Sequence, residues 1–352
     1  MNNQNNVKSP RKGAILFIGN HLSRLNQNPS LTEELSQKLE VIGWGVLLSS
    51  RRQNKILRLM DMAGTILIKS RQYDIAEVDV FSGQAFLWAE FCTSLLCLQK
   101  KPVVLTLHGG NLPEFSAKHP NRVRKLLKKA AIITVPSRYL HETMKQYRAD
   151  LRIISNAIDI NQYQYSQKIN PRPELIWLRA FHKMYNPELA IHVLHQLHQE
   201  FPTMKLVMVG PDKGDGSLQS AINLVSDYGF EYFVQFPGSV SKTEVPVWLN
   251  KGDIFLNTTN VDNTPVSVIE AMACGLCVVS TNVGGIPYLI DNGSDGILTS
   301  PDNLEEMAEA VKSLLINPSL ASEISKNARE KVEEFDWSKV IPLWEDIFES
   351  LL

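Results

Sequence analysis

The chain has 352 residues, of which 44% are hydrophobic and 21% are charged, so its composition is that of a globular protein. This length exceeds a single ordinary hydrophobic core and suits two domains. A formal net charge of −1 and a sequence pI near 6.7 argue against a nucleic-acid-binding protein.

The N-terminus is polar and basic and has no apolar signal core, which predicts a disordered lead-in over residues 1–12. The longest apolar stretch, residues 85–98, contains Glu90 and is too short to span a bilayer. We therefore expect a cytoplasmic protein, and we leave open a peripheral attachment to the inner face of the plasma membrane.

A strand–loop–helix rhythm repeats through the first half of the chain. The continuous apolar run at residues 14–18 is typical of a parallel strand that is covered on both faces. The other expected strands are residues 46–48, 76–80, 102–107, 132–135 and 151–154, and the expected helices are residues 31–43, 84–98, 122–130 and 139–147. This alternation predicts a doubly wound parallel sheet.

Two loops in this half follow predicted strands. The loop at Gly19 lacks the G-x-G-x-x-G pattern, which argues against a nicotinamide enzyme. A ligand contact and an ordinary turn are equally compatible with this loop. The second loop begins at His108 and continues with two glycines. Ligands of open α/β sheets bind beyond the carboxyl ends of strands, so His108 is a candidate ligand contact, with a purely structural histidine as the alternative.

A basic segment at residues 122–129 forms a third feature of this half. Its cations alternate with apolar residues, and the set is Arg122, Val123, Arg124, Lys125, Leu126, Leu127, Lys128 and Lys129. The pattern predicts a basic amphipathic helix that is able to lie on an anionic membrane surface. A solvated helix face is the alternative.

The polar run at residues 162–173 contains two prolines and predicts a linker. It separates a first domain, residues 1–165, from a second domain, residues 174–337. The second domain opens with a predicted strand at residues 174–178, which Arg179 and Lys183 follow. Two cations at a strand end suit a diphosphate, whose charge must be neutralised as it leaves. Surface cations without a ligand are the alternative.

Residues 262–275, DNTPVSVIEAMACG, follow a predicted strand at 253–257. Thr264 suits an N-cap and Pro265 suits the first helical position, so a helix is expected to continue through residues 266–274. Asp262 then lies on the loop before the helix and Glu270 lies within it. The free N–H groups at the helix start make an anion site beside Asp262.

Cys274 and Cys277 have C-x-x-C spacing, which invites a metal or redox interpretation. The chain has no second such pair, so buried thiols in a reducing compartment are the favoured interpretation, and no metal is expected.

Asp262 and Glu270 resemble the Glu-x7-Glu motif of the retaining family-4 glycosyltransferases, with aspartate in the first place. The likeness continues through EAMACG and through VVSTNVGGIP at residues 278–287, and it covers nearly the whole chain. It implies the GT-B fold, which has two doubly wound Rossmann-like domains facing across a cleft. It also implies that the C-terminal helix, residues 338–352, packs back onto the first domain. Leu178 and Met184 depart from the family pattern, which has glycine at both places.

The resemblance implies a retaining transfer of a sugar from a nucleotide-diphosphate sugar to a glycan, lipid-linked or small-molecule acceptor, as in cell-surface polysaccharide or glycoconjugate synthesis. Arg179 and Lys183 would hold the diphosphate. Glu270 would bind the ribose, and Asp262 would hold the donor sugar. The backbone N–H groups that assist Asp262 would be those of Val266 and Ser267.

The same resemblance gives roles to three further positions. His108, in a T-x-H-G context, would reach the transferred sugar. Gly19 would approach the donor or the acceptor, and Gly238 lies in a segment expected near the nucleotide base. No Asp-x-Asp motif follows a suitable strand, so a metal-independent reaction is expected, with no cofactor besides the donor substrate.

Two other functions remain open from the sequence. One is a sugar-nucleotide epimerase on the same fold, which would bind the donor without an acceptor. The other is a catalytically inactive partner subunit of a glycosyltransferase complex. The presence of Arg179, Lys183, Asp262 and Glu270 together argues against the inactive subunit.

Overall fold

The computed structural model describes residues 12–21 and 29–352. Tertiary contacts divide the chain into two compact units. Unit 1 runs to Ser155 and also includes Val340–Leu352, and unit 2 is Asn156–Lys339. Of the lead-in for which disorder is predicted, only Lys12 lies within the described residues, and its ammonium group is 2.5 Å from the Glu345 carboxylate.

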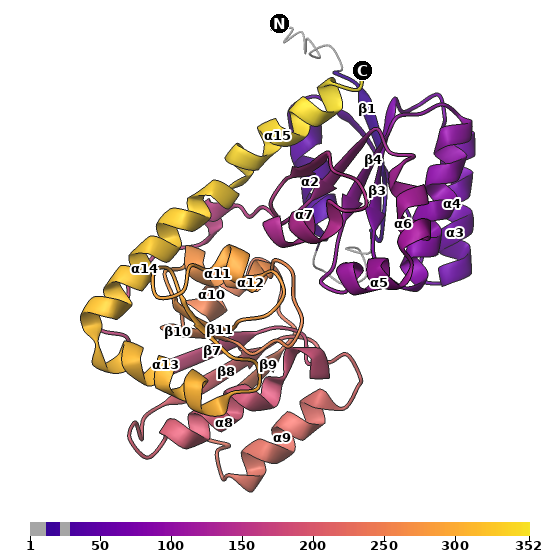
Figure 1. Cartoon of the computed structure of the whole chain (residues 1–352). Coiled ribbons are helices and arrows are strands. Elements are labelled where there is room, and N and C mark those ends of the chain that lie inside the picture. The colour runs from indigo at the N-terminus through magenta and orange to yellow at the C-terminus, as the bar shows by residue number, and fades with distance from the viewer. Residues whose placement is uncertain (1–11, 22–28) are drawn as a thin grey trace, which may run out of the picture. The chain divides into compact units, whose positions relative to one another are not determined.

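Unit 1 is built on a six-stranded sheet with the order β2-β1-β3-β4-β5-β6 (Figure 1). All neighbouring strands are parallel. The strands are β1 (Ala14–Ile18), β2 (Gly45–Ser49), β3 (Ile75–Val80), β4 (Val103–Leu107), β5 (Ile132–Val135) and β6 (Leu151–Ile153). Every residue of β1, β4 and β5 is buried, as expected for strands that helices cover on both faces.

The helices of unit 1 are α2 (Leu31–Val41), α3 (Lys55–Ile68), α4 (Gln84–Leu98), α5 (Leu112–Lys118), α6 (Pro120–Leu127) and α7 (Arg138–Met144). A capping box between Ser30 and Glu33 fixes the start of α2, because each side chain accepts a hydrogen bond from the other residue's backbone N–H. The sequence analysis did not predict α3 or α5. Helix α6 ends three residues before the predicted end of the basic helix.

Unit 2 has a second six-stranded parallel sheet, with the order β12-β11-β10-β7-β8-β9 (Figure 1). Its strands are β7 (Glu174–Leu178), β8 (Lys205–Val209), β9 (Val234–Gly238), β10 (Ile254–Asn257), β11 (Cys277–Thr281) and β12 (Ile297–Thr299). Its helices are α8 (Pro187–Leu197), α9 (Ser217–Asp227), α10 (Val245–Leu249), α11 (Val266–Ala273), α12 (Ile286–Leu289), α13 (Leu304–Ile316) and α14 (Pro318–Val332). The two sheets with their flanking helices confirm the predicted pair of doubly wound domains.

The chain passes from unit 1 to unit 2 ten residues before the expected end of the first domain at residue 165. The reason is that residues 156–173, the predicted linker included, are held by unit 2. The Tyr163 hydroxyl donates to the Glu270 carboxylate at 2.8 Å, and the buried Lys168 ammonium lies 3.2 Å from the Asp253 carboxylate.

The last helix, α15 (Trp337–Glu349), begins in unit 2, and its residues from Val340 onward belong to unit 1. The ring of Phe348 packs against Trp44 and Phe17 of unit 1, with centroid distances of 5.8 and 6.2 Å. Trp344 stacks on the same ring. The aromatic side chains on the apolar stripe of α15 are thus buried against unit 1.

Cys274 and Cys277 are free thiols with no exposed surface. Burial raises the pKa of each to about 12, so both are neutral at physiological pH. The predicted burial of this pair is confirmed. In the described residues no three or more His, Cys, Asp or Glu side chains are grouped as a metal site would need.

Each sheet contains one topological switch point, where successive connections turn to opposite sides of a strand. In unit 1 this point lies between β1 and β3, and in unit 2 it lies between β7 and β10. Ligands of doubly wound sheets bind beyond the carboxyl ends of strands at such points. The loops after these four strands are therefore where a site is expected within each unit.

Candidate functional site

The switch point of unit 2 brings together two of the predicted residues. Arg179 follows β7, Asp262 lies on the loop after β10, and the Arg179 guanidinium donates a hydrogen bond to the Asp262 carboxylate. Both side chains are mostly buried, with 17% and 13% of their surface exposed. A cation and an acid 83 positions apart thus form one polar centre because their strands are neighbours.

The Arg179 guanidinium lies over the ring of Tyr185, 4.3 Å from its centroid. Burial lowers the pKa of Arg179, and the nearby Tyr185 and Glu270 act in the opposite direction. The Nε of Arg179 is buried and has no hydrogen-bond partner in the described part of the chain. A buried charged donor without an acceptor is costly unless a ligand supplies one.

Two hydroxyls beside this ion pair are also without partners. Thr264 and Ser267 are 9% and 7% exposed, and the Oγ atom of each finds no hydrogen-bond partner among the described residues. They lie on either side of the residue that precedes helix α11. Together with the Nε of Arg179 they form a set of buried polar atoms that a polar ligand would satisfy.

The start of α11 differs from the prediction by one residue. Pro265, not Thr264, is the N-cap residue, and the helix begins at Val266. The extended ψ of 118° at Pro265 accounts for the difference, since it keeps this residue outside the helix. The backbone N–H groups of Val266 and Ser267 belong to the first turn, where no intrahelical acceptor exists.

Glu270 lies one turn further along α11 and is 4% exposed. Its Oε1 accepts from the Tyr163 hydroxyl at 2.8 Å and lies 3.0 Å from the Lys242 ammonium. Its charge acts on Arg179, so the two predicted acids share one electrostatic environment. Helix geometry places Glu270 on the buried side, in agreement with the apolar character of the whole helix.

Two glycines fit tightly against the loop that carries Asp262. A Cβ on Gly284 would lie 2.1 Å from the carbonyl oxygen of Asp262, and one on Gly285 would lie 1.9 Å from that of Asn263. The Gly285 N–H also donates to the Asp262 carbonyl at 3.1 Å. Only glycine allows this approach, so the Gly-Gly pair sets the position of the loop that carries Asp262.

We expect Gly285→Ala to lower the glycosyl transfer that the sequence predicts by at least about tenfold, because a shift of the loop moves Asp262 relative to Arg179. The φ of Gly285 is −88°, which alanine adopts without strain, so the effect is steric alone. Initial rates with saturating donor measure it. Gly293→Ala is the control for a general loss of stability, since nothing lies near its Cβ position although its φ is positive. Equal rates for Gly285→Ala and wild type would show that the position of the Asp262 loop does not limit the reaction.

Lys183 and Gly238 have fewer contacts. The Lys183 side chain is exposed, and its backbone N–H donates to Asp215 at 2.8 Å. The turn that it begins is tied to the loop after β10, because the Met184 carbonyl accepts from the Asn260 N–H at 2.8 Å. Gly238 ends β9 with a φ of +77° and open space at its Cβ position. Within the described residues, neither Lys183 nor Gly238 forms a hydrogen bond or an ion pair with the side chains of Arg179 and Asp262.

The switch point of unit 1 gathers a different set of polar groups. His108 follows β4, and its Nε2 lies 2.8 Å from the Asp79 carboxylate at the end of β3. The ring of His108 stacks on Phe81, with 4.9 Å between the centroids. A Cβ on Gly19 would lie 2.2 Å from Asp79 Oδ2, so this glycine makes room for the carboxylate. Thr32 donates to the same carboxylate at 3.3 Å.

Two further titratable groups lie beside this cluster. Glu77, two residues before Asp79 on β3, is 2% exposed, and burial together with the Asp79 charge raises its pKa well above the ordinary value. His21 is 1% exposed, and burial lowers its pKa. For both groups burial thus favours the neutral form over the charged one.

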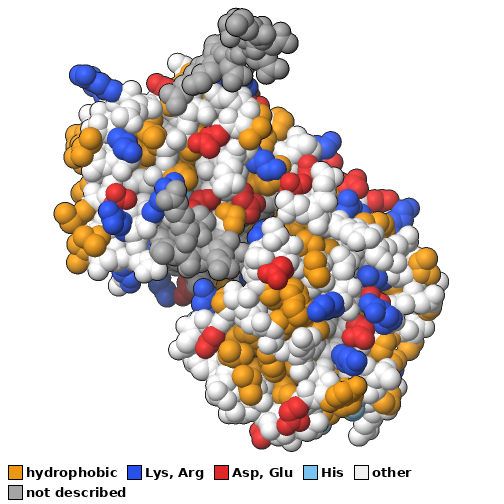
Figure 2. Space-filling view, turned by 180° about the vertical axis from the view of Figure 1, so that it is seen from behind, with side chains coloured by type: hydrophobic (Ala, Val, Ile, Leu, Met, Phe, Trp, Pro, Cys, Tyr) orange, Lys and Arg blue, Asp and Glu red, His pale blue; other side chains and the backbone are white. Residues whose placement is uncertain are grey.

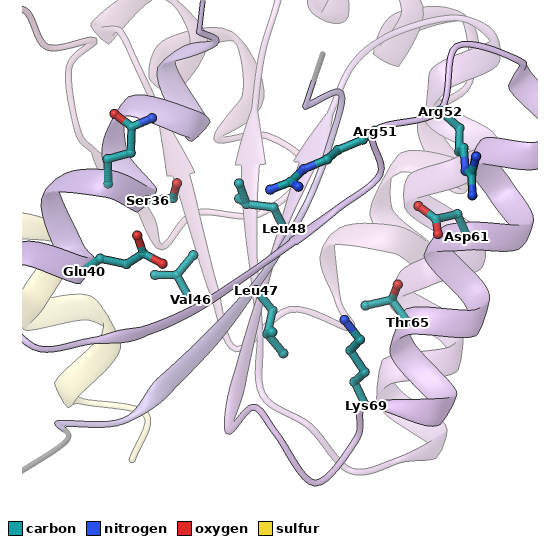
Figure 3. A pocket seen from close by; sticks show the side chains of 11 residues that line it. Ser36, Glu40, Val46, Leu47, Leu48, Arg51, Arg52, Asp61, Thr65 and Lys69 are labelled. Atoms are coloured by element: carbon teal, nitrogen blue, oxygen red, sulfur yellow. The ribbon is translucent and has the colours of Figure 1, made fainter. Parts of the chain in front are cut away.

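Unit 1 also contains a pocket of about 600 Å³ on the outer side of the sheet. Figure 3 shows it between α2, the edge strand β2 and α3, with Arg51 and Lys69 extending along its walls. Val46, Leu47 and Leu48 of β2 supply its apolar lining. None of the residues predicted for the site lines this pocket.

Four contacts of the site were not predicted from the sequence. They involve Asp79, Tyr163, Tyr185 and Lys242. Asp79 had a usable signal, because it is an acid at the carboxyl end of an apolar strand. The others reach their partners only through tertiary folding, and nothing in their local sequence indicates this.

The family comparisons agree with the fold. Residues 29–162 match the model for the family described as Glycosyltransferase Family 4, and residues 160–331 match that for Glycosyl transferases group 1. The architecture defines a GT-B protein. The chain belongs to the family-4 type of glycosyltransferases.

Individual relatives are distant. The chain is 26% identical over 267 residues to N-acetyl-alpha-D-glucosaminyl L-malate synthase of Bacillus anthracis, which covers 71% of this chain and 68% of that protein. It is 22% identical over 250 residues to D-inositol 3-phosphate glycosyltransferase of Rhodococcus jostii, covering 66% of this chain and 55% of that protein. Other curated relatives are matched over about half their length or less.

Solved structures show the same fold at low identity. Sucrose-phosphate synthase from Thermosynechococcus elongatus superposes with a TM-score of 0.80 at 17% identity, covering 96% of this chain and 99% of that one. HepE of Anabaena in complex with UDP-glucose gives a TM-score of 0.74 at 17% identity, covering 96% and 100%. At this identity the likeness supports the GT-B fold alone.

Proposed function

We propose that this chain is a retaining, metal-independent glycosyltransferase that takes its sugar from a nucleoside-diphosphate donor, with a uridine diphosphate sugar as the first candidate. The observation that carries the proposal is the Arg179–Asp262 pair, surrounded by buried polar atoms without partners. The choice of uridine rests on the HepE structures, which contain UDP or UDP-glucose. The donor needs no additional cofactor.

In this proposal the diphosphate lies against Arg179 and Lys183. Arg179 is already positioned by Tyr185 and by Asp262, so little reorganisation is needed when negative charge develops on the leaving phosphate. Lys183, whose side chain is exposed, binds the second phosphate through its ammonium group. The orphan Nε of Arg179 then gains an acceptor, which is the physical reason for its burial.

The transferred sugar and the ribose bind at opposite ends of the segment that runs from Asp262 to Glu270. Asp262 accepts from the hydroxyls of the donor sugar, and the N–H groups and hydroxyls around Val266 and Ser267 bind the adjoining phosphate or sugar oxygens. Glu270 binds the ribose, while Lys242 and Tyr163 hold its carboxylate in place.

Retention follows from attack on the face that the leaving phosphate vacates, with that phosphate as the base. The described side chains around Asp262 include no acid that is free of a cationic partner and placed as a nucleophile, since Asp262 pairs with Arg179 and Glu270 pairs with Lys242. His108, oriented by Asp79, contributes a hydrogen bond to the transferred sugar. The acceptor is a glycan, a lipid-linked sugar or a small molecule of a cell-surface polysaccharide or glycoconjugate route.

A thermal-shift screen tests the donor site. UDP at a hundredfold excess over its dissociation constant should stabilise the protein by about 2.7 kcal/mol, because the ligand binds the folded state only. The screen compares UDP, GDP, ADP and their glucose conjugates, each with and without EDTA. A larger shift with another base would correct the choice of nucleotide, and loss of the shift in EDTA would overturn metal independence.

Product analysis tests the reaction type. Incubation with the bound sugar nucleotide and acceptor mixtures should give a glycoside with the anomeric configuration of the donor, which NMR of the anomeric proton reads directly. A product of inverted configuration would contradict retention. Conversion of the donor alone into its epimer would favour an epimerase instead.

A further inference from the structure

Helices α3 and α4 of unit 1 carry apolar side chains on their outer faces. In α3, Ile56, Met60 and Leu67 are 72%, 65% and 53% exposed, and in α4, Leu87, Phe91 and Leu98 are 55%, 43% and 80% exposed. Within each helix these three positions repeat at intervals of four and seven residues, which places them on one face. The two stripes together are called the α3–α4 face below.

The opposite faces of both helices are also apolar, because they cover the sheet. Met62 and Ile66 of α3 and Phe86, Cys92 and Leu96 of α4 belong to the hydrophobic core. The two helices pack against each other. A monomer rarely exposes a contiguous apolar surface of this kind without a partner.

Cations border the α3–α4 face on its α4 side. Helix α6 lies beside α4, because Arg122 makes two hydrogen bonds to the Glu90 carboxylate, at 2.8 and 2.5 Å, and Lys129 donates to Ser94 at 2.7 Å. The exposed cations that follow on this helix and just after it are Arg124, Lys125 and Lys128. These three side chains form no ion pair within the described residues.

Cations border the α3 side as well. The pocket in Figure 3 adjoins α3 and has exposed Arg51, Arg52 and Lys69 at its rim, with Glu40 and Asp61 among them. In Figure 2 hydrophobic side chains gather along the outer edge of unit 1, with Lys and Arg side chains among them. Residues 84–131 contain eight Lys and Arg but only two acids, and both acids are already paired, Glu90 with Arg122 and Glu114 with Lys118.

We propose that the α3–α4 face is a membrane-binding surface that inserts its apolar side chains at the acyl boundary of an anionic bilayer. The flanking cations of α6 and of the pocket rim contact the lipid phosphates. An apolar stripe that is bordered by the cations of α6 and, on the α3 side, by a rim with more cations than acids suits an anionic membrane interface. A second copy of this chain fits less well, because an isologous contact would bring the same cations into opposition.

This surface differs from the basic amphipathic helix that the sequence predicts. Val123, Leu126 and Leu127 of that helix are buried in the core of unit 1, so they cannot enter a bilayer. The helix supplies charge only, and the apolar contact comes from its neighbours. None of the helices in the described residues is long and apolar enough to cross a membrane.

Flotation with vesicles tests the proposal on the full chain. The vesicles contain either phosphatidylglycerol and phosphatidylcholine in equal amounts or phosphatidylcholine alone. We expect the wild type to float with the anionic vesicles and to be released by salt, since each cation at the surface contributes about fivefold to partitioning. Met60→Gln, Leu87→Gln and Leu98→Gln combined should lower the partition constant by at least about a hundredfold.

Two matched variants control for charge and for general apolar exposure. Arg124→Glu, Lys125→Glu and Lys128→Glu combined should abolish the preference for anionic vesicles. Tyr232→Gln, Val247→Gln and Ile316→Gln remove equally exposed apolar side chains of unit 2 and should leave flotation unchanged. Melting temperatures show that every variant folds.

Absence of wild-type binding, or equal binding by the apolar triple variant, would overturn the proposal. Sedimentation velocity tests the alternative that a second copy of the chain binds to the α3–α4 face. If the wild type is a dimer without lipid and the apolar triple variant is a monomer, the α3–α4 face is an interface between two copies. None of these measurements depends on glycosyl transfer, so their failure leaves the proposed activity unaffected.

Discussion

Arg179→Ala should lower kcat by about 10²- to 10³-fold, which corresponds to the loss of roughly 3 kcal/mol of transition-state stabilisation. The reason is that this guanidinium is fixed before the donor arrives, by Tyr185 beneath it and by Asp262 beside it. A cation that needs no reorganisation acts most strongly on the charge that develops as the diphosphate leaves. Steady-state rates at saturating donor measure the effect.

Lys183→Ala provides a graded comparison. Its side chain is exposed, and solvent screens its charge more than that of Arg179, so we expect a smaller loss of about tenfold. Lys251→Ala is the matched control, because this exposed lysine of unit 2 stacks on Trp248 and has no part in the site. Rates of both site variants within a factor of about two of the wild type would exclude these cations from catalysis.

The strands of unit 1 were largely predictable, since most of them are apolar runs between turn signals. Strands β5 and β7 and helix α4 coincide with their predicted bounds. Helix α3 was not predicted, although Asn54 supplies an N-cap signal before it. Gly64 in the middle of this helix weakens its local helix propensity.

The candidate site was likewise predictable only in part. Arg179 and Asp262 could be proposed from position, because each follows an apolar strand and switch points collect such residues. Their ion pair could not, since it depends on β7 and β10 being neighbours, which no local pattern reveals. The partners of Glu270 are not predictable for the same reason, because Tyr163 comes from a segment whose composition predicts a linker.

Substitutions of Asp262, on the loop before α11, and of Glu270, within α11, should affect the binding of different ligands. Asp262→Asn keeps the size and an acceptor but removes the charge at the donor sugar. We expect turnover to fall by about 10²-fold. The affinity for the nucleoside diphosphate itself should stay nearly unchanged, since this ligand lacks the transferred sugar and Arg179 becomes free to bind its phosphate.

Glu270→Ala should act on the diphosphate instead. Hydrogen bonds from hydroxyls to a carboxylate contribute roughly 1.5–3 kcal/mol each, so the dissociation constant should rise by about 10- to 100-fold. The measurement is calorimetric titration of both variants with the nucleoside diphosphate that gives the largest thermal shift, beside an activity assay. Equal loss of affinity in Asp262→Asn and Glu270→Ala would show that the assignment of sugar to one acid and ribose to the other is wrong.

Tyr163→Phe distinguishes a ligand role of Glu270 from a structural one. It removes the hydroxyl that donates to the Glu270 carboxylate at 2.8 Å and leaves the carboxylate and its Lys242 partner in place. Because the bond is buried, the melting temperature should fall by an amount that matches roughly 1 kcal/mol. If Glu270 only ties α11 to the segment around Tyr163, both variants will lower stability and neither will alter the affinity for the diphosphate beyond that effect. If Glu270 binds the ribose, Tyr163→Phe will lower stability while the affinity stays close to that of the wild type, and Glu270→Ala alone will weaken the diphosphate.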